Sequence, residues 1–139
     1  MPDMAEVNRQ VIEEFRANGG EVRTGMFAGR RLLLLTTSGA RTGVARTSPL
    51  MFFEHAGQLV VFGSHGGAPT NPGWYHNLKA HPEVTVELGP ERYAARAVIT
   101  SGAQRAELYA AAVAAHPFIA GLQERARREI PLVVLERHG

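Results

Sequence analysis

The chain of 139 residues has no cysteine, a single lysine and a single tryptophan. Without cysteine, structural disulfides, a cysteine-ligated zinc site and thiol catalysis are all excluded. The longest apolar run is far shorter than the roughly 18 residues that a membrane helix needs, and the N-terminus lacks a basic region followed by an apolar signal core. These absences predict a cytoplasmic protein with no stable membrane insertion.

An excess of charge of one sign is also missing, because 14 arginines and one lysine stand against 13 acidic residues and leave a formal net charge of +2. The arginines form no dense cluster with interleaved aromatic residues, so we expect no nucleic-acid partner. The six histidines show no metal-ligand spacing with a third ligand, and no serine lies in a nucleophile elbow. We therefore expect no metal site and no hydrolase activity.

Hydrophobic content of 45% and charged content of 20% are typical of a single globular domain. The sequence divides into an N-terminal helix with a connector, residues 1–28, and a cofactor-binding barrel, residues 29–139. Apolar residues at helical spacing predict a helix over residues 4–18 that packs on the barrel. The alternatives are that this helix covers the mouth of a cofactor site or touches a membrane surface.

Apolar runs, alternation and glycine or proline breaks predict the other elements. Strands are expected at residues 32–37, 47–53, 58–64, 83–88, 92–100 and 130–136. Helices are expected at residues 72–80, 103–115 and 118–127, the first with Asn71 as its N-cap and Pro72 at its first position. These elements predict an α+β fold, a compact barrel of six mainly antiparallel strands with helices at both ends and one between strands.

The stretch from Leu32 to Met51 organises the chain. Its four leucines predict a strand buried on both faces, and Pro49 in the next strand fits only an edge, a bulge or a strand start. The glycine-rich turn between these strands is flanked by Arg41 and Arg46. Free backbone amides in such a turn form a nest for phosphate or carboxylate oxygens, to which the two guanidinium groups add donors. A hairpin with solvated arginines is the alternative.

Three segments carry a resemblance to a known family: TTSGARTGVARTSPL, GSHGGAPTNPGWYHNLKAHPEVTVEL and, near the end, REIPLVVLE. Together they resemble the deazaflavin-dependent nitroreductases, also called coenzyme F420-dependent quinone reductases, over roughly residues 29–136. The resemblance implies a split β-barrel related to the FMN-binding flavin reductases. It also implies coenzyme F420 as cofactor and hydride transfer from the deazaflavin C5 to a small electrophilic acceptor, such as a quinone, an activated alkene or a nitro compound.

The resemblance also implies the cofactor-binding residues. Basic positions in the first turn hold the phosphate and acidic tail, the start of the second strand lies against the deazaflavin ring, a second glycine loop binds an anion, and the helix after it carries a family signature. The residues are Arg41, Thr42, Arg46, Thr47, Ser48, Pro49, Leu50, Gly63, Ser64, His65, Gly66, Gly67, Trp74 and Asn77. His65 departs from the family, which usually has lysine there, so its contact depends on pH near neutrality.

A second departure lies in residues 116–122, which contain no tyrosine, whereas family members that reduce nitro compounds or quinones can carry several in this segment. This argues against activation of nitroimidazoles and leaves hydride transfer intact, since the hydride comes from the cofactor. His116 is a candidate proton donor, with a structural role at the helix end as the alternative. An FMN-binding reductase and a non-catalytic deazaflavin-binding protein are the rival functions, and a homodimer is expected by analogy with related barrels.

Overall fold

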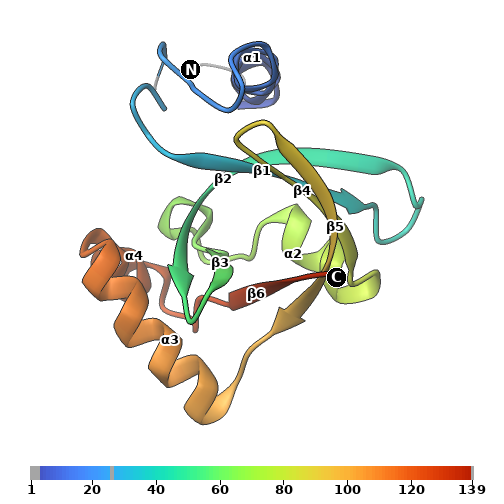
Figure 1. Ribbon diagram of the computed structural model, residues 1–139. Helices are drawn as coiled ribbons and strands as arrows, with labels where there is room; N and C mark the ends of the chain where they lie inside the picture. The colour runs from blue at the N-terminus through green and yellow to red at the C-terminus, as the bar shows by residue number, and fades with distance from the viewer. Residues whose placement is uncertain (1–3, 26, 139) are drawn as a thin grey trace.

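The computed structural model describes residues 4–25 and 27–138. These residues form six strands and four α-helices, with one short 3₁₀-helix, η1, before the second α-helix (Figure 1). In order the elements are α1 (Met4–Ala17), β1 (Leu32–Ser38), β2 (Ala45–His55), β3 (Gln58–Phe62), η1 (His65–Gly67), α2 (Gly73–Ala80), β4 (Glu83–Leu88), β5 (Glu91–Ile99), α3 (Gly102–Ala115), α4 (Phe118–Ala126) and β6 (Leu132–Arg137).

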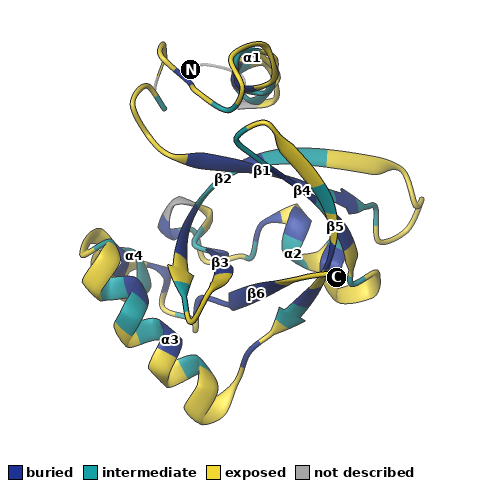
Figure 2. Ribbon diagram, in the orientation of Figure 1, coloured by how far each residue is buried: buried dark blue, intermediate teal, exposed yellow. Residues whose placement is uncertain are grey.

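All strand pairs are antiparallel, and the order β1-β2-β3-β6-β5-β4 closes into a barrel through pairing of β1 with β4. This confirms the predicted fold class. In the leucine run, Leu33 and Leu35 face the barrel interior, whereas Leu32 and Leu34 pack in a separate cluster beneath α1. Successive side chains point to opposite faces of a strand, so a run without alternation is buried on both faces, as predicted (Figure 2).

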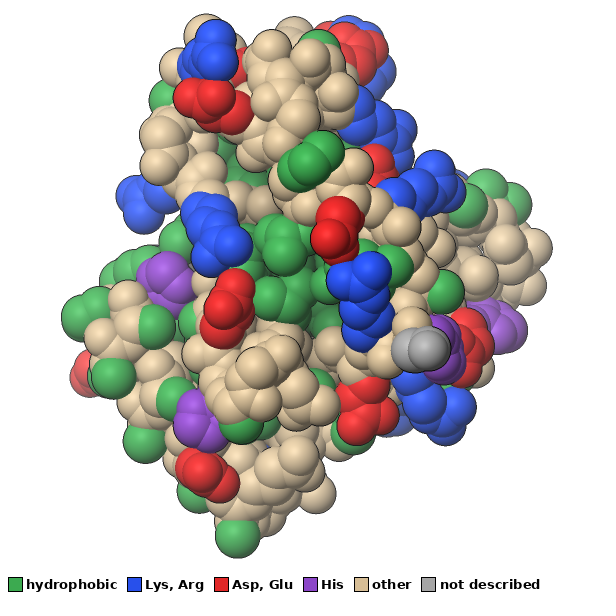
Figure 3. All heavy atoms as spheres, viewed as in Figure 1, with side chains coloured by type: hydrophobic (Ala, Val, Ile, Leu, Met, Phe, Trp, Pro, Cys, Tyr) green, Lys and Arg blue, Asp and Glu red, His purple; other side chains and the backbone are tan. Residues whose placement is uncertain are grey.

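Helices α3 and α4 cover a second outer face of the barrel, beside β3 (Figure 1). At one end of the barrel, Figure 3 shows hydrophobic side chains in a central hollow with basic and acidic side chains around it. Arg31 pairs with Glu54, and its guanidinium lies 4.9 Å from the centre of the Phe52 ring. No helix in residues 4–25 or 27–138 is long and apolar enough to cross a membrane.

Helix α1 packs on β1 through Val11 and Phe15. Arg16 fixes it further, because its Nε and Nη2 donate to the two carboxylate oxygens of Glu87 at 3.0 and 2.9 Å. Glu87 is only 8% exposed, and its hydrogen bonds raise the pKa of Arg16 above its ordinary value. A buried carboxylate without this partner would be costly, so the pair ties α1 to the barrel.

Most predicted boundaries differ from the observed ones by one or two residues, and two of these differences have a clear structural cause. Helix α2 begins at Gly73 with Pro72 as its N-cap, because the Asn71 side chain does not cap the helix and instead accepts a hydrogen bond from Arg128. Strand β2 begins at Ala45, two residues earlier than predicted, because it pairs with β1 up to the Ala45–Ser38 position. Arg46 therefore lies on a strand.

Strand β2 has a free edge that positions the site. Residues 45–51 pair with β1, and only residues 52–55 pair with β3. Backbone groups of residues 45–51 that face away from β1 therefore have no strand partner there. Pro49 lies in the middle of this edge, where its missing N–H breaks no ladder, so the predicted edge position is confirmed.

Candidate functional site

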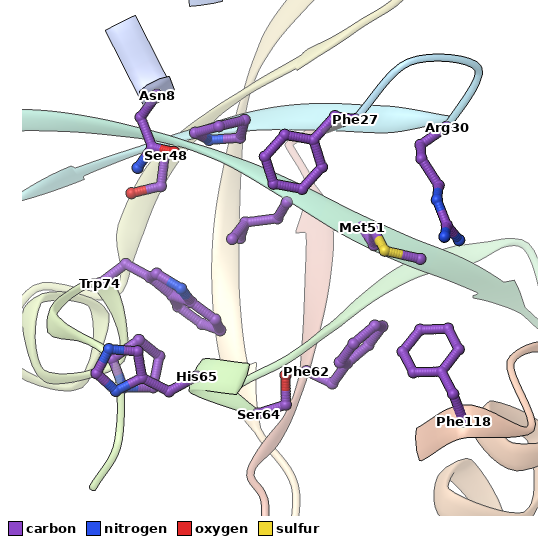
Figure 4. Close-up of a pocket in the computed structure, with 13 residues that line it drawn as sticks. Asn8, Phe27, Arg30, Ser48, Met51, Phe62, Ser64, His65, Trp74 and Phe118 are labelled. Atoms are coloured by element: carbon purple, nitrogen blue, oxygen red, sulfur yellow. The ribbon is translucent and has the colours of Figure 1, made fainter. Parts of the chain in front are cut away.

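A cavity of about 670 Å³ lies beside the free edge of β2 (Figure 4). Four segments that are distant in sequence surround it: α1 with its connector, β2, the loop after β3 into α2, and the start of α4. The lining residues are Asn8, Phe27, Arg30, Ser48, Pro49, Leu50, Met51, Phe62, Ser64, His65, Pro72, Trp74 and Phe118. No acidic residue is among these described lining residues, and most of them are apolar.

The cavity is a slot with aromatic walls. In Figure 4, Trp74 and His65 lie on one side and Phe62 and Phe118 on the other, and Phe27 lies above them. Trp74 and Phe62 are buried, whereas Phe118 is 43% exposed at the mouth. Such walls accept a flat ring system, and the unpaired backbone groups of β2 are available for polar atoms at the ring's edge.

Arg128 organises the loop from Gly63 to Asn71. Its guanidinium donates to the carbonyl oxygens of Gly63 (3.1 Å), Ser64 (3.2 Å), Ala68 (3.1 Å) and Thr70 (2.9 Å), and to the side-chain oxygen of Asn71. One half-buried side chain thus satisfies five acceptors of a loop that has little regular structure of its own. The loop carries two cavity residues, so Arg128 sets the shape of one wall.

Glycine is required at two places in this loop. A Cβ at Gly63 would lie 2.8 Å from Cγ of Pro131, and Gly67 has φ +83° with Arg125 packed against it. His65 also has a positive φ, 48°, and its Nδ1 donates to the carbonyl oxygen of Thr70 at 3.2 Å. Its Nε2 is therefore the nitrogen left for a ligand.

The turn after β1 is held differently from the prediction. The N–H groups of Gly39 and Gly43 bond within the turn, that of Val44 donates to the Thr42 hydroxyl, and that of Ala40 donates to Asn77 Oδ1 at 3.0 Å. Four of the amides expected to form an anion nest are thus already bonded, three within the turn and one to α2. The guanidinium groups of Arg41 and Arg46 are exposed, and neither has a hydrogen bond or ion pair within residues 4–25 and 27–138.

Comparison with known proteins identifies the family. The model of the F420H(2)-dependent quinone reductase family matches residues 7–137. The chain belongs to this family. It is 34% identical over 126 residues to an F420H(2)-dependent quinone reductase of Mycobacterium tuberculosis H37Rv, covering 88% of this chain and 85% of that one.

Two solved structures share the fold and much of the sequence. One, described as an F420-H2 dependent reductase (FDR-A), is 37% identical with a TM-score of 0.69, covering 76% of this chain and 93% of that one. The other, described as a domain-swapped dimer, is 32% identical with a TM-score of 0.72, covering 96% and 98%. These relatives fit the split-barrel class expected from the family segments of the sequence.

The residues of this family member fit a deazaflavin. A flat apolar slot, a strand edge with free backbone groups and two unpaired arginines at the start of that strand match a planar ring with an anionic tail. Of the predicted residues, the structure brings together at the cavity Ser48, Pro49, Leu50, Ser64, His65 and Trp74. It places outside the cavity lining Arg41, Thr42, Arg46, Thr47, Gly63, Gly67 and Asn77, and the predicted role of Gly66 lies outside what the structure describes.

Asn77 acts on the first turn rather than on the cavity. Besides accepting from Ala40, it donates through Nδ2 to the Thr37 hydroxyl at 3.1 Å. It therefore joins helix α2 to the end of β1, beside Arg41. Asn77 thus fixes the first turn through a backbone amide, instead of contacting the cavity.

His116 does not line the cavity. Its Nε2 donates to the carbonyl oxygen of Phe52 at 3.1 Å, and its ring centre lies 5.6 Å from that of Phe118 and 6.1 Å from that of Phe62. It also caps α3, with its N–H bonded to Ala112. These contacts support the structural alternative, in which His116 holds the aromatic wall.

Sequence reasoning missed half of the cavity. Asn8 and Phe27 come from α1 and its connector, and Phe62 and Phe118 from the ends of other elements. The only sequence signal was that residues 116–122 replace a tyrosine-bearing family segment, which pointed to the region of Phe118. Arg128 was also missed as a site residue, although it is the first residue of the segment REIPLVVLE that carries part of the family resemblance.

Proposed function

We propose that the chain is an F420H2-dependent reductase that delivers a hydride to a small planar electrophile of the quinone or activated-alkene type. The observation that carries the proposal is the aromatic slot at the free edge of β2, with unpaired arginines at one end of the same strand. Family membership supports it, because the matching model and the M. tuberculosis relative carry this activity in their descriptions.

The cofactor's ring would lie against Ser48, Pro49 and Leu50, with Trp74 on the opposite wall. Its anionic tail would run toward Arg41, in the turn before β2, and Arg46, at the start of β2. Because neither arginine has a protein partner among the described residues, both are available for phosphate or carboxylate oxygens. His65 would add a donor through Nε2 from the second loop.

When bound, the reduced deazaflavin supplies one hydride and one proton, so that a quinone leaves as a hydroquinone and the cofactor is left oxidised. The protein's own part is placement. Phe62, Phe118 and Met51 line the other end of the slot and can hold a flat acceptor face to face with the ring. Phe118 has no hydroxyl group that could donate a proton. We assign His116 a positioning role, because its ring packs against Phe62 and Phe118.

The test is a pair of titrations of cofactor-free protein, with coenzyme F420 and with FMN, each at two salt concentrations. We expect F420 to bind more tightly than FMN and its Kd to rise with salt. A variant with Arg41→Gln and Arg46→Gln should raise that Kd about tenfold, as expected for loss of exposed charge-assisted contacts. Arg92→Gln, which removes another exposed, unpaired arginine on β5, is the matched control and should leave the Kd unchanged.

Turnover completes the test. With F420H2 present, we expect oxidation of the cofactor upon addition of a naphthoquinone, followed by absorbance. Tight F420 binding without turnover on any quinone or activated alkene would support a carrier instead. Binding of FMN but not F420 would favour the flavin alternative and overturn the proposal.

We also infer that the protein forms a homodimer, which the description of one relative as a domain-swapped dimer supports. Light scattering on the purified protein tests this inference, and a monomer at all concentrations would contradict it. The cytoplasmic location and the division into residues 1–28 and 29–139 stay predictions.

A further inference from the structure

Arg30 is a second cationic feature of the cavity, separate from the arginines of the first turn. It lines the cavity near Met51, at the end where Phe118 lies, and its side chain points down along that end (Figure 4). Its guanidinium is exposed and makes no hydrogen bond or ion pair to any part of the chain that the structure describes. A cation without a partner therefore stands at the mouth of a slot that has no acidic lining residue.

The backbone beneath Arg30 is held in place. Its N–H donates to the carbonyl oxygen of Phe27 at 3.0 Å, and the N–H of Gly29 donates to that of Val22 at 3.0 Å. Upstream, the Glu14 carboxylate accepts from Thr24 Oγ1 at 2.6 Å and from the Arg23 amide. Hydrogen bonds thus hold the described residues before Arg30, and the backbone of Arg30 itself is bonded to Phe27.

Neighbouring arginines are already paired. Arg23 and Arg31 line a second cavity of about 580 Å³ together with Arg30, but they bind Glu21 and Glu54 at 2.9 and 3.4 Å. The nearby carboxylates are therefore occupied by other partners. Arg30 is the guanidinium of this group that is left for a ligand.

Arg30 lies near Met51, and this end of the cavity is too far from Arg46 for both arginines to bind the same anion. Arg46 and Met51 are five residues apart on this strand, which is about 17 Å at 3.3–3.4 Å per residue. The ring-binding residues Ser48 to Leu50 lie between them. A cofactor whose tail reaches Arg46 and whose ring lies on Pro49 therefore leaves the Arg30 end to the acceptor.

We propose that Arg30 selects acceptors in which the planar reducible ring carries a carboxylate. The planar guanidinium fork fits a carboxylate with two parallel hydrogen bonds, while Phe62 and Phe118 hold the ring beside it. This inference rests on the proposed function, since it names the substrate class of the same site.

The experiment compares two acceptors with F420H2 as donor: a naphthoquinone with a propanoate side chain, and its methyl ester. The two share the reducible ring and differ in the charge at the end of the chain. We expect wild-type protein to prefer the acid, mainly through a lower KM that rises with salt. In Arg30→Gln, the preference, measured as the ratio of kcat/KM values, should fall about tenfold, the size of one charge-assisted hydrogen bond at a partly solvated site.

Two further variants distinguish an effect of the planar guanidinium group from an effect of charge alone and from the loss of any exposed arginine. Arg30→Lys keeps the charge but not the fork, so we expect it to restore part of the preference. Arg92→Gln is the matched control and should keep the wild-type ratio. A general loss of fold in Arg30→Gln would lower activity on both acceptors alike and would also appear as a lower Tm.

The outcomes distinguish this inference from the proposed function. If wild-type protein reduces neither naphthoquinone, the proposed function fails. If it reduces both with equal kcat/KM, or if Arg30→Gln keeps the wild-type ratio, the reductase activity stands and the role of Arg30 is refuted.

Discussion

Replacing Arg128 with lysine tests whether this residue, which is not among the lining residues, holds one wall of the cavity in place. Arginine at this position spans five oxygen acceptors between Gly63 and Asn71. A lysine ammonium has three donors and no planar fork, so it cannot reach both ends of this loop at once. Carbonyl groups of the loop would be left without a partner.

The magnitude follows from these contacts. Hydrogen bonds from a charged donor contribute about 1.5–3 kcal/mol each when buried, but Arg128 is only half-buried, and water can replace its bonds to exposed Thr70. Gly63 is buried and has no such replacement. We therefore expect Arg128→Lys to lower the free energy of unfolding by about 2–3 kcal/mol, which is a Tm loss of roughly 6–12 °C for a domain of this size.

Cofactor binding should weaken as well, because Ser64 and His65 would no longer be held at the cavity. We expect the Kd for F420, measured by fluorescence below the Tm of the variant, to rise about tenfold or more. A purely structural role elsewhere in the fold would lower the Tm without changing this Kd.

Arg127→Lys is the control, since Arg127 is adjacent and exposed and its side chain has no hydrogen bond or ion pair among the described residues. The reasoning would be refuted if Arg128→Lys unfolded and bound F420 like the Arg127 control.

Three other perturbations have outcomes set by single contacts. In Gly63→Ala, the new Cβ would lie 2.8 Å from the Pro131 ring, so thermal denaturation should show a loss of about 1–3 kcal/mol, and an unchanged Tm would contradict the geometry. Asn77→Ala frees the Ala40 amide and should raise the Kd for F420 while that for a tail-less deazaflavin stays the same. Hydrogen bonds from the Thr24 side chain and the Arg23 backbone lower the pKa of Glu14, so its contribution to stability is present above about pH 4.3 and lost as the pH falls through the lowered value. The Tm of Glu14→Gln should therefore fall less between pH 7 and pH 3 than that of wild-type protein.

The fold could be predicted from the sequence because its signals are local. The leucine run and the alternation of residues 83–88 each gave a strand, and the proline and glycine breaks gave the turns between them. Pro49 went further, since its missing N–H limited this position to an edge, a bulge or a strand start, and the observed edge is where the cavity lies. The error at Asn71 arose from a contact with a distant residue, Arg128, and the error at Ala45 from pairing with Ser38 across the turn.

The site could be predicted only where a family motif or a strand edge marked it. Phe27 and Arg30 come from a connector without periodicity, and nothing in its sequence indicates that it passes over β2. The turn after β1 shows the opposite failure. Its composition is typical of an anion nest, but Asn77, which lies on a helix 37 residues further along the chain, takes the Ala40 amide. Composition reports which donors a turn has and cannot report which of them the fold consumes.

The two loops expected to hold the cofactor are therefore each positioned by a side chain from another element. Asn77 of α2 holds the turn that carries Arg41, and Arg128, between α4 and β6, holds the loop that carries His65. A loop that is already fixed loses less conformational entropy when a ligand binds, so these two residues favour binding without touching the ligand. Arg128 contributes five of the hydrogen bonds that hold the second loop, whereas His65 contributes one, to the carbonyl oxygen of Thr70. The position of this loop therefore depends mainly on a residue outside the cavity.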